Sequence, residues 1–141
     1  MRENFIKITV NLKGKNNPKA EHIWAKRIGK GKAEIANIPF FTRKCGLGDI
    51  VRYVIDEEGE RVFNRRIKKK SNTFYIAYDK TDNEESNQKR YEEVVKHYEK
   101  YGIFVEGLIV GHAAIAVPVN FEDDLLEIAF DTQPHYVEIE Y

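Results

Sequence analysis

Four histidines and one cysteine are the residues of this 141-residue chain best suited to binding a metal ion or to nucleophilic attack. They are His22, Cys45, His97, His112 and His135. None lies at the spacing of a metal motif, since the sequence has no C-x-x-C, no H-x-x-x-H and no His-Glu motif on a predicted helix. The sequence therefore predicts no metal site and no cofactor.

Cys45 is the one residue that could act as a nucleophile in a glycine-rich loop. Arg43 and Lys44 precede it, and neighbouring cations lower a thiol pKa. A nucleophilic cysteine also needs an oriented base, and no local pattern ties a histidine to Cys45. We therefore expect an ordinary loop thiol and no catalytic residues, with an enzyme that uses Cys45 as a third hypothesis. His112 is predicted to be a turn residue.

Charge is unevenly distributed along the chain, although 23 basic and 23 acidic residues give a net charge of zero. Residues 1–71 carry 18 Lys and Arg against 8 Asp and Glu, a net charge of +10. Residues 72–141 carry 5 against 15, a net charge of −10. Such asymmetry bears on the partners of a protein and not on its fold.

The acidic half contains two clusters that could face a basic protein. They consist of Glu84 and Glu85, and of Glu122, Asp123 and Asp124. The alternative is that these carboxylates only stabilise the positive ends of two helices.

The basic half contains a run that could contact the phosphates of RNA. The candidates are Arg65, Arg66, Lys68 and Lys69, with Lys26, Arg27, Lys30 and Lys32 on neighbouring predicted strands. Trp24, Phe40 and Phe41 could stack on bases. The alternative is a solvated basic face without a ligand.

Apolar periodicity predicts which elements position these residues. Alternation at Ile6, Ile8, Val10 and Leu12 predicts a strand, and residues 22–28, 33–38, 50–55 and 61–67 predict four more. Short turns join them without helical periodicity. Residues 1–71 are therefore predicted to form a small β-barrel of the SH3-like type.

The pattern changes in residues 72–141. After a strand at 73–78, Tyr91, Val94, Val95, Tyr98 and Tyr101 recur at helical spacing, with Asn83 as the N-cap and Gly102 at the C-terminal end. Strands at 104–109 and 113–119 follow. A second helix after Asn120 places Phe121, Leu125, Ile128 and Ala129 on its apolar side, and a strand at 135–141 ends the chain. The order is β-α-β-β-α-β, which predicts a ferredoxin-like half and an α+β protein.

Three short segments of the sequence resemble a family signature. Trp24-Ala25, Asn37-Ile38-Pro39-Phe40-Phe41 and Gly46-Leu47-Gly48-Asp49-Ile50-Val51 are similar to the bacterial family named domain of unknown function 4265, and Ala116-Val117-Pro118 and Val137-Glu138-Ile139-Glu140 extend the resemblance to about residues 20–141. The chain departs from the family at one tripeptide: it has Lys70-Ser71-Asn72 where the resemblance leads us to expect Ser-Gly-His. The resemblance supports the architecture and implies no activity.

We therefore expect a non-enzymatic protein-binding module, of which an immunity or antitoxin-type inhibitor of a basic toxin is one form. An RNA-binding or ribosome-associated module is the alternative. A single cysteine and the lack of a long apolar run predict a cytoplasmic protein without membrane contact. The sequence leaves the oligomeric state open.

Overall fold

The chain folds into two compact units, Met1–Ser71 and Asn72–Tyr141. The computed structural model describes residues 4–15 and 18–140. The boundary between the units is also the position at which the net charge changes sign along the sequence.

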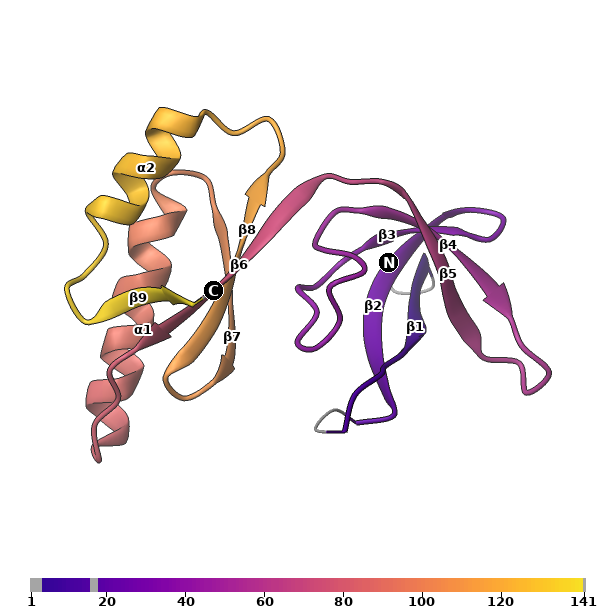
Figure 1. The fold of residues 1–141 in the computed structure, drawn as a ribbon, viewed down its shortest axis with the longest axis horizontal. Coiled ribbons are helices and arrows are strands. Elements are labelled where there is room, and N and C mark those ends of the chain that lie inside the picture. The colour runs from indigo at the N-terminus through magenta and orange to yellow at the C-terminus, as the bar shows by residue number, and fades with distance from the viewer. Residues whose placement is uncertain (1–3, 16–17, 141) are drawn as a thin grey trace. The chain divides into compact units, whose positions relative to one another are not determined.

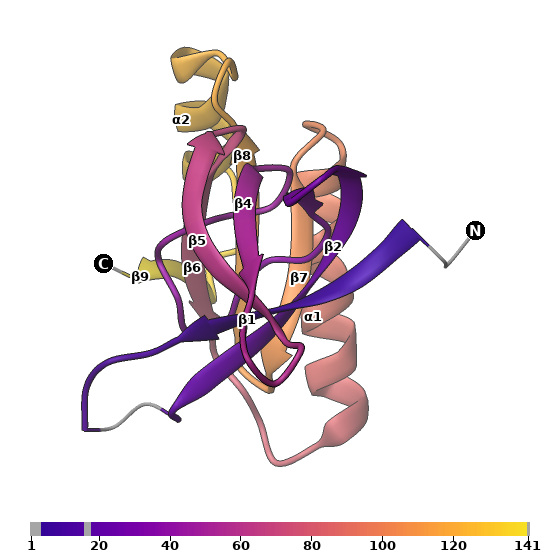
Figure 2. The same ribbon diagram turned by 90° about the vertical axis from the view of Figure 1, so that its right-hand side faces the viewer.

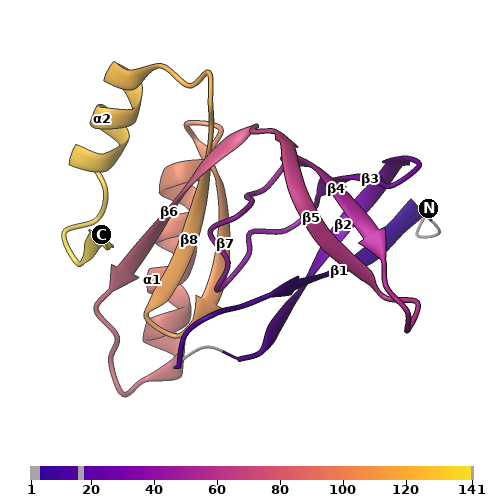
Figure 3. The same ribbon diagram turned by 45° about the vertical axis from the view of Figure 1, so that its right-hand side comes forward.

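Unit 1 is built from five strands, which Figure 2 shows in part and Figure 3 labels in full. They are β1 (Phe5–Asn11), β2 (Ala20–Gly29), β3 (Lys32–Ile35), β4 (Ile50–Ile55) and β5 (Arg61–Lys68). Successive strands pair in antiparallel fashion, and a parallel pairing of Thr9 with Val62 joins β1 to β5. The strands thus form the closed ring β1-β2-β3-β4-β5, so the five strands predicted for residues 1–71 are confirmed.

The interior of the ring explains the alternation in the sequence, since every second side chain of a strand points inward. The largest fully buried side chains of this core are Ile8, Val10, Ile23, Ile35 and Val51. Strand β3 ends at Ile35, three residues earlier than predicted. The reason lies in Asn37, whose side-chain Oδ1 accepts the Trp24 N–H at 2.8 Å in place of a strand carbonyl.

Unit 2 contains the remaining elements in the predicted order (Figure 1). They are β6 (Ser71–Tyr78), α1 (Glu84–Glu99), β7 (Phe104–Ile109), β8 (His112–Pro118), α2 (Asp123–Asp131) and β9 (Val137–Glu140). The sheet order is β7-β8-β6-β9, and the pairs β6–β9 and β7–β8 are antiparallel. The protein is therefore a mixed α+β fold with two helices and mostly antiparallel sheets, as expected.

The termini of α1 follow from residue types near each end. Asn83 is the N-cap, and its Oδ1 accepts the Ser86 N–H at 3.0 Å, as predicted. At the other end the C-cap is Lys100, and Gly102 adopts a φ of 78° two residues later. That left-handed conformation favours glycine and turns the chain toward β7.

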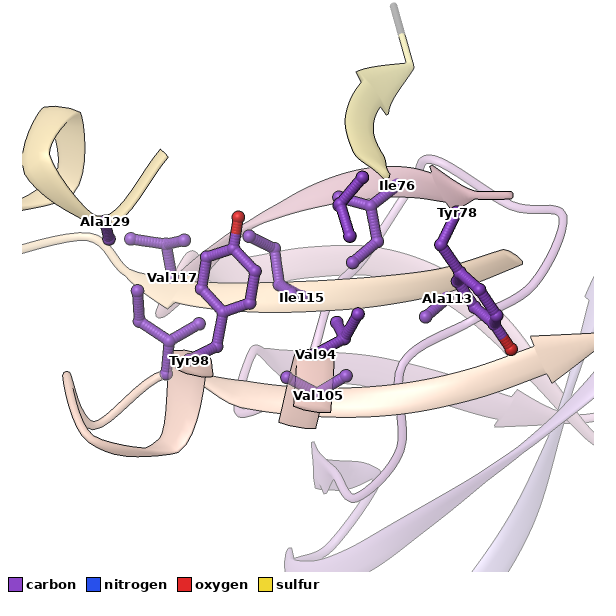
Figure 4. Close-up of a cluster of buried hydrophobic side chains, with 11 residues drawn as sticks. Ile76, Tyr78, Val94, Tyr98, Val105, Ala113, Ile115, Val117 and Ala129 are labelled. Carbon is purple, nitrogen blue, oxygen red and sulfur yellow. The ribbon is translucent and has the colours of Figure 1, made fainter. Parts of the chain in front are cut away.

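The core of unit 2 lies between the helices and one face of the sheet (Figure 4). Fully buried side chains from α1, β6 and β8 meet there, among them Tyr98, Ile76 and Ile115. Helix α2 contributes Ala129, with Leu126 and Phe130 packed against the core.

The predicted apolar side of α2 is wrong in part. Leu125 is 36% exposed and Ile128 is 50% exposed, whereas Leu126 and Phe130 take the positions facing the core. A nine-residue helix with four large apolar side chains permits two different apolar sides, and packing against the sheet decides which is buried. Glu122 is the N-cap of α2, and its side chain makes no cap hydrogen bond.

Candidate partner-binding surfaces

The two acidic clusters lie at opposite ends of the helical layer of unit 2. Glu84 and Glu85 occupy the first turn of α1, whereas Glu122, Asp123 and Asp124 lie at the start of α2. The two helices run in opposite directions, so their N-termini are far apart (Figure 1). The five carboxylates therefore do not form one continuous acidic face.

The exposed side of α2 combines acidic and apolar side chains. Leu125 and Ile128 are exposed three residues apart and therefore neighbour each other on the helix. Asp124 lies four residues before Ile128 and Asp131 three residues after it, so both neighbour Ile128 on the helix surface. Glu127 directly precedes Ile128 in the sequence. These five residues are called the α2 surface below.

Helix α2 carries no basic side chain to neutralise its acids. Asp123, Glu127 and Asp131 follow one another at intervals of four, which places like charges side by side. Asp131 also lies in the last turn, where the helix dipole disfavours a negative charge. The carboxylates of α2 therefore repel one another, and a bound cationic group would reduce this repulsion.

The exposed pair Phe40 and Phe41 lies on a loop that Glu21 holds in place. Their ring centroids are 4.5 Å apart, and the side chains are 36% and 39% exposed. The Glu21 carboxylate on β2 accepts three consecutive backbone N–H groups, from Phe40 at 2.5 Å, Phe41 at 3.0 Å and Thr42 at 2.9 Å. Two aromatic rings are therefore presented to solvent on a fixed backbone.

A second carboxylate, that of Asp49, holds the end of the same loop. Asp49 is fully buried, and it accepts the backbone N–H groups of Gly46 at 2.8 Å and Lys70 at 2.7 Å. Arg66 forms an ion pair with it at 3.5 Å. Gly48 adopts a φ of 81°, which permits the sharp turn into β4.

The residues proposed to contact RNA do not come together on one face. Trp24 is exposed on β2, whereas Arg65 and Arg66 lie on β5, which is not adjacent to β2 in the ring. In a closed ring the outer faces of non-adjacent strands point in different directions. Arg66 is also engaged with Asp49, while Lys68 and Lys69 are exposed at the end of β5.

Comparison with known proteins now identifies the family. A family model described as a domain of unknown function (DUF4265) matches residues 21–133. The chain belongs to this family. None of the curated proteins matches it. Among solved structures, a hypothetical protein from Neisseria gonorrhoeae is similar, with a TM-score of 0.67 and 17% identity over 95% of this chain and 91% of that one. At this identity the likeness shows a shared fold alone.

The signature residues of this DUF4265 protein make hydrogen bonds that hold the signature segments in place. Asn37 binds the backbone of Trp24, and Asp49 binds Gly46 within its own segment. The Ser71 Oγ donates to the Leu47 carbonyl at 2.6 Å. The signature thus describes how the segment after β3 is anchored.

Sequence reasoning missed the role of Glu21 in this DUF4265 chain. Its three partners lie about twenty residues away, so no local pattern reveals the contact. Asp49 could have been found, because an acid after Gly-Leu-Gly is a common way to fix a turn.

Cys45 is buried in the core of unit 1, and the exposed loop thiol considered from the sequence is not found. Its pKa is raised from 9.0 to about 12, chiefly by burial and in addition by the nearby carboxylates of Asp49 and Glu21, against the opposing effect of Arg66. The residue is therefore a neutral thiol at physiological pH.

Three of the histidines make separate local contacts within their units. His22 Nδ1 lies 3.0 Å from Thr9 Oγ1, and the buried His97 places Nε2 2.7 Å from the Ala129 carbonyl oxygen. His112 begins β8 directly after the turn glycine, and its Nδ1 lies 2.7 Å from Glu140 Oε1. Across residues 4–15 and 18–140, no group of three or more His, Cys, Asp or Glu residues could hold a metal ion.

An open pocket of about 490 Å³ lies between the start of α1 and the β7–β8 turn. Glu84, Gln88 and Tyr91 line it on the helix side, and Ile109 and Val110 on the other.

The helices in the described part of the chain are too short or too polar to cross a membrane.

Proposed function

We propose that this protein is a non-enzymatic protein-binding module whose partner is a basic protein, as for an immunity or antitoxin-type inhibitor of a basic toxin. The site is the α2 surface. Of the acidic residues named from the sequence, Asp124 belongs to this surface, Glu122 and Asp123 lie beside it at the start of α2, and Glu84 and Glu85 are assigned to stabilising the start of α1.

The observation that carries the proposal is the exposure of Leu125 and Ile128 beside carboxylates. Leu125 is 36% and Ile128 50% exposed in a helix whose other apolar side chains pack on the core. Binding sites commonly combine an apolar centre with a charged rim, in which the apolar contact supplies affinity and the charges supply steering and specificity. An apolar pair rimmed by acids fits a basic amphipathic segment.

Two finer points of architecture and location accompany the proposal. The closed five-stranded ring supports an SH3-like barrel for unit 1, and the β7-β8-β6-β9 order supports a ferredoxin-like unit 2. A single, buried cysteine fits a reducing compartment such as the cytoplasm.

The test is affinity capture from host cells with three matched variants of the full chain. Leu125→Ser with Ile128→Ser removes the apolar centre, and Glu127→Lys with Asp131→Lys reverses the rim. Glu84→Lys with Glu85→Lys makes the same change in net charge at the start of α1 and is the control.

The proposal requires that the wild-type chain and the α1 control capture the same basic protein at near-stoichiometric yield, and that both α2 variants lose it. Recovery of no protein partner overturns the proposal. Loss of the partner by the α1 control as well would also overturn the assignment to α2, because net charge alone would then explain binding.

A further inference from the structure

A row of three cations crosses the outer face of the ring in unit 1. Lys32 on β3 lies directly opposite Arg52 on β4, and Arg52 lies directly opposite Arg65 on β5. Val51 and Tyr53, the neighbours of Arg52 along its strand, point into the core, so Arg52 points outward. These three residues are called the cationic row below.

The cationic row is not neutralised within the part of the chain that the structure describes. No carboxylate of residues 4–15 and 18–140 forms an ion pair with Lys32, Arg52 or Arg65. The nearest acid in the strand register is Glu34, which lies opposite Ile50 and makes no ion pair.

Like charges in directly opposite positions of neighbouring strands destabilise a sheet. Two such pairs in succession place three cationic residues on neighbouring strands whose backbones are about 5 Å apart. An arrangement that is unfavourable in the free protein becomes favourable when a polyanion binds along it.

We propose that the cationic row binds the phosphate backbone of single-stranded RNA. This inference concerns unit 1 and is independent of the protein partner proposed for α2. Of the residues named from the sequence for RNA, it keeps Lys32 and Arg65, replaces Arg66 by Arg52, and assigns Trp24, Phe40 and Phe41 no part, since the row lies across β3, β4 and β5.

The shape of the site favours a single strand over a duplex. The row spans roughly 10 Å, the width of three neighbouring strands, and it lies on the outer surface of the ring. Reading a duplex in the major groove requires a protruding helix or a two-stranded ribbon, whereas the row presents only side-chain cations from a curved sheet. RNA is the abundant single-stranded polyanion of cells, so it is the occupant to which we commit.

The test is fluorescence anisotropy of labelled oligouridine with the full chain, between about 50 and 200 mM KCl. Each neutralised phosphate of a single strand contributes a slope of about −0.7 to the logarithm of the affinity against the logarithm of the salt concentration. The variant Lys32→Gln, Arg52→Gln, Arg65→Gln should therefore flatten the slope by about 2.

The control Lys7→Gln, Lys19→Gln, Lys44→Gln removes the same charge from exposed positions of unit 1 outside the row. The proposal expects the control to retain most of the affinity and slope of the wild-type chain. An equal loss in the control, or no binding at low salt, overturns it.

Two further measurements separate other occupants. Equal affinity for duplex RNA would overturn the assignment to single-stranded RNA. Self-association of the wild-type chain without RNA, seen by light scattering and lost in the row variant, would show that a second copy covers the row and would also overturn it.

Discussion

The carboxylate of Glu21 accepts the backbone N–H of Phe41 at 3.0 Å across twenty residues of sequence. Through this contact and its two companions, one side chain of β2 fixes the loop on which the aromatic pair is exposed. The loop therefore owes part of its conformation to a side chain on a strand that is distant in the sequence.

Replacing Glu21 should destabilise unit 1. Glu21→Ala leaves three backbone N–H groups without their charged acceptor, and hydrogen bonds to charged groups contribute about 2 kcal/mol each, of which water recovers a part. We expect a loss of about 2 kcal/mol in the free energy of unfolding. Trp24 is the single tryptophan of the chain, so its fluorescence in urea follows unit 1. Glu34→Ala, at an exposed position of β3, is the control and should change stability little.

Cys45 should be unreactive in the folded chain. Burial raises its pKa to about 12, and the thiolate is the reactive species. Iodoacetamide should therefore label it only after unfolding. Rapid labelling of the native chain at pH 8 would contradict the buried, neutral thiol.

The same pKa shift gives a direction for stability against pH. Between the unfolded value of 9.0 and the folded value of about 12 the folded state binds the proton more tightly. The contribution of the neutral thiol is thus complete below pH 9 and is lost as pH rises toward 12. Urea titrations should show this loss in the wild-type chain and less of it in Cys45→Ala.

The two sides of α2 should respond differently to truncation. Phe130→Ala removes a side chain packed on the core and should cost about 3 kcal/mol, whereas Ile128→Ala should cost less than about 0.5 kcal/mol because Ile128 is half exposed. Both helices lie in unit 2, so far-UV circular dichroism follows its unfolding. Equal costs for the two variants would refute the assignment of the buried side.

Gly107 should not tolerate a side chain. A Cβ at this position would lie 3.2 Å from the ring of Tyr91, which packs across β7. Gly107→Ala should therefore destabilise unit 2 by about 1 to 3 kcal/mol. Gly29→Ala, where a Cβ would meet nothing within 4 Å, is the matched control and should be close to neutral.

The cationic row should lower the stability of the free protein. Arg52→Gln removes the middle charge from both like-charged pairs and should raise the free energy of unfolding of unit 1 by about 0.2 to 1 kcal/mol. Trp24 fluorescence in urea at low salt measures this gain, and added salt should reduce it. A loss of stability on this substitution would show that Arg52 makes favourable contacts in the folded state.

Local patterns in the sequence were enough to predict most elements of the fold. Alternation in Ile6, Ile8 and Val10 marks a strand with one buried side, and the spacing of Tyr91, Val94 and Tyr98 marks α1, because both periods follow from backbone geometry. The charge of each half is likewise a property of the sequence alone. The DUF4265 family was also predicted correctly, from segments that prove to be anchored to one another.

The arrangement of charged side chains in space was decided only by the tertiary structure. Whether Glu85 and Asp123 share a face depends on the directions of two helices, and whether Lys32 meets Arg65 depends on the register of three strands. Neither is encoded in neighbouring residues, since helix direction follows from the connections of the sheet and register from packing of the inner face. For the same reason, the sequence alone did not determine which side of α2 is buried.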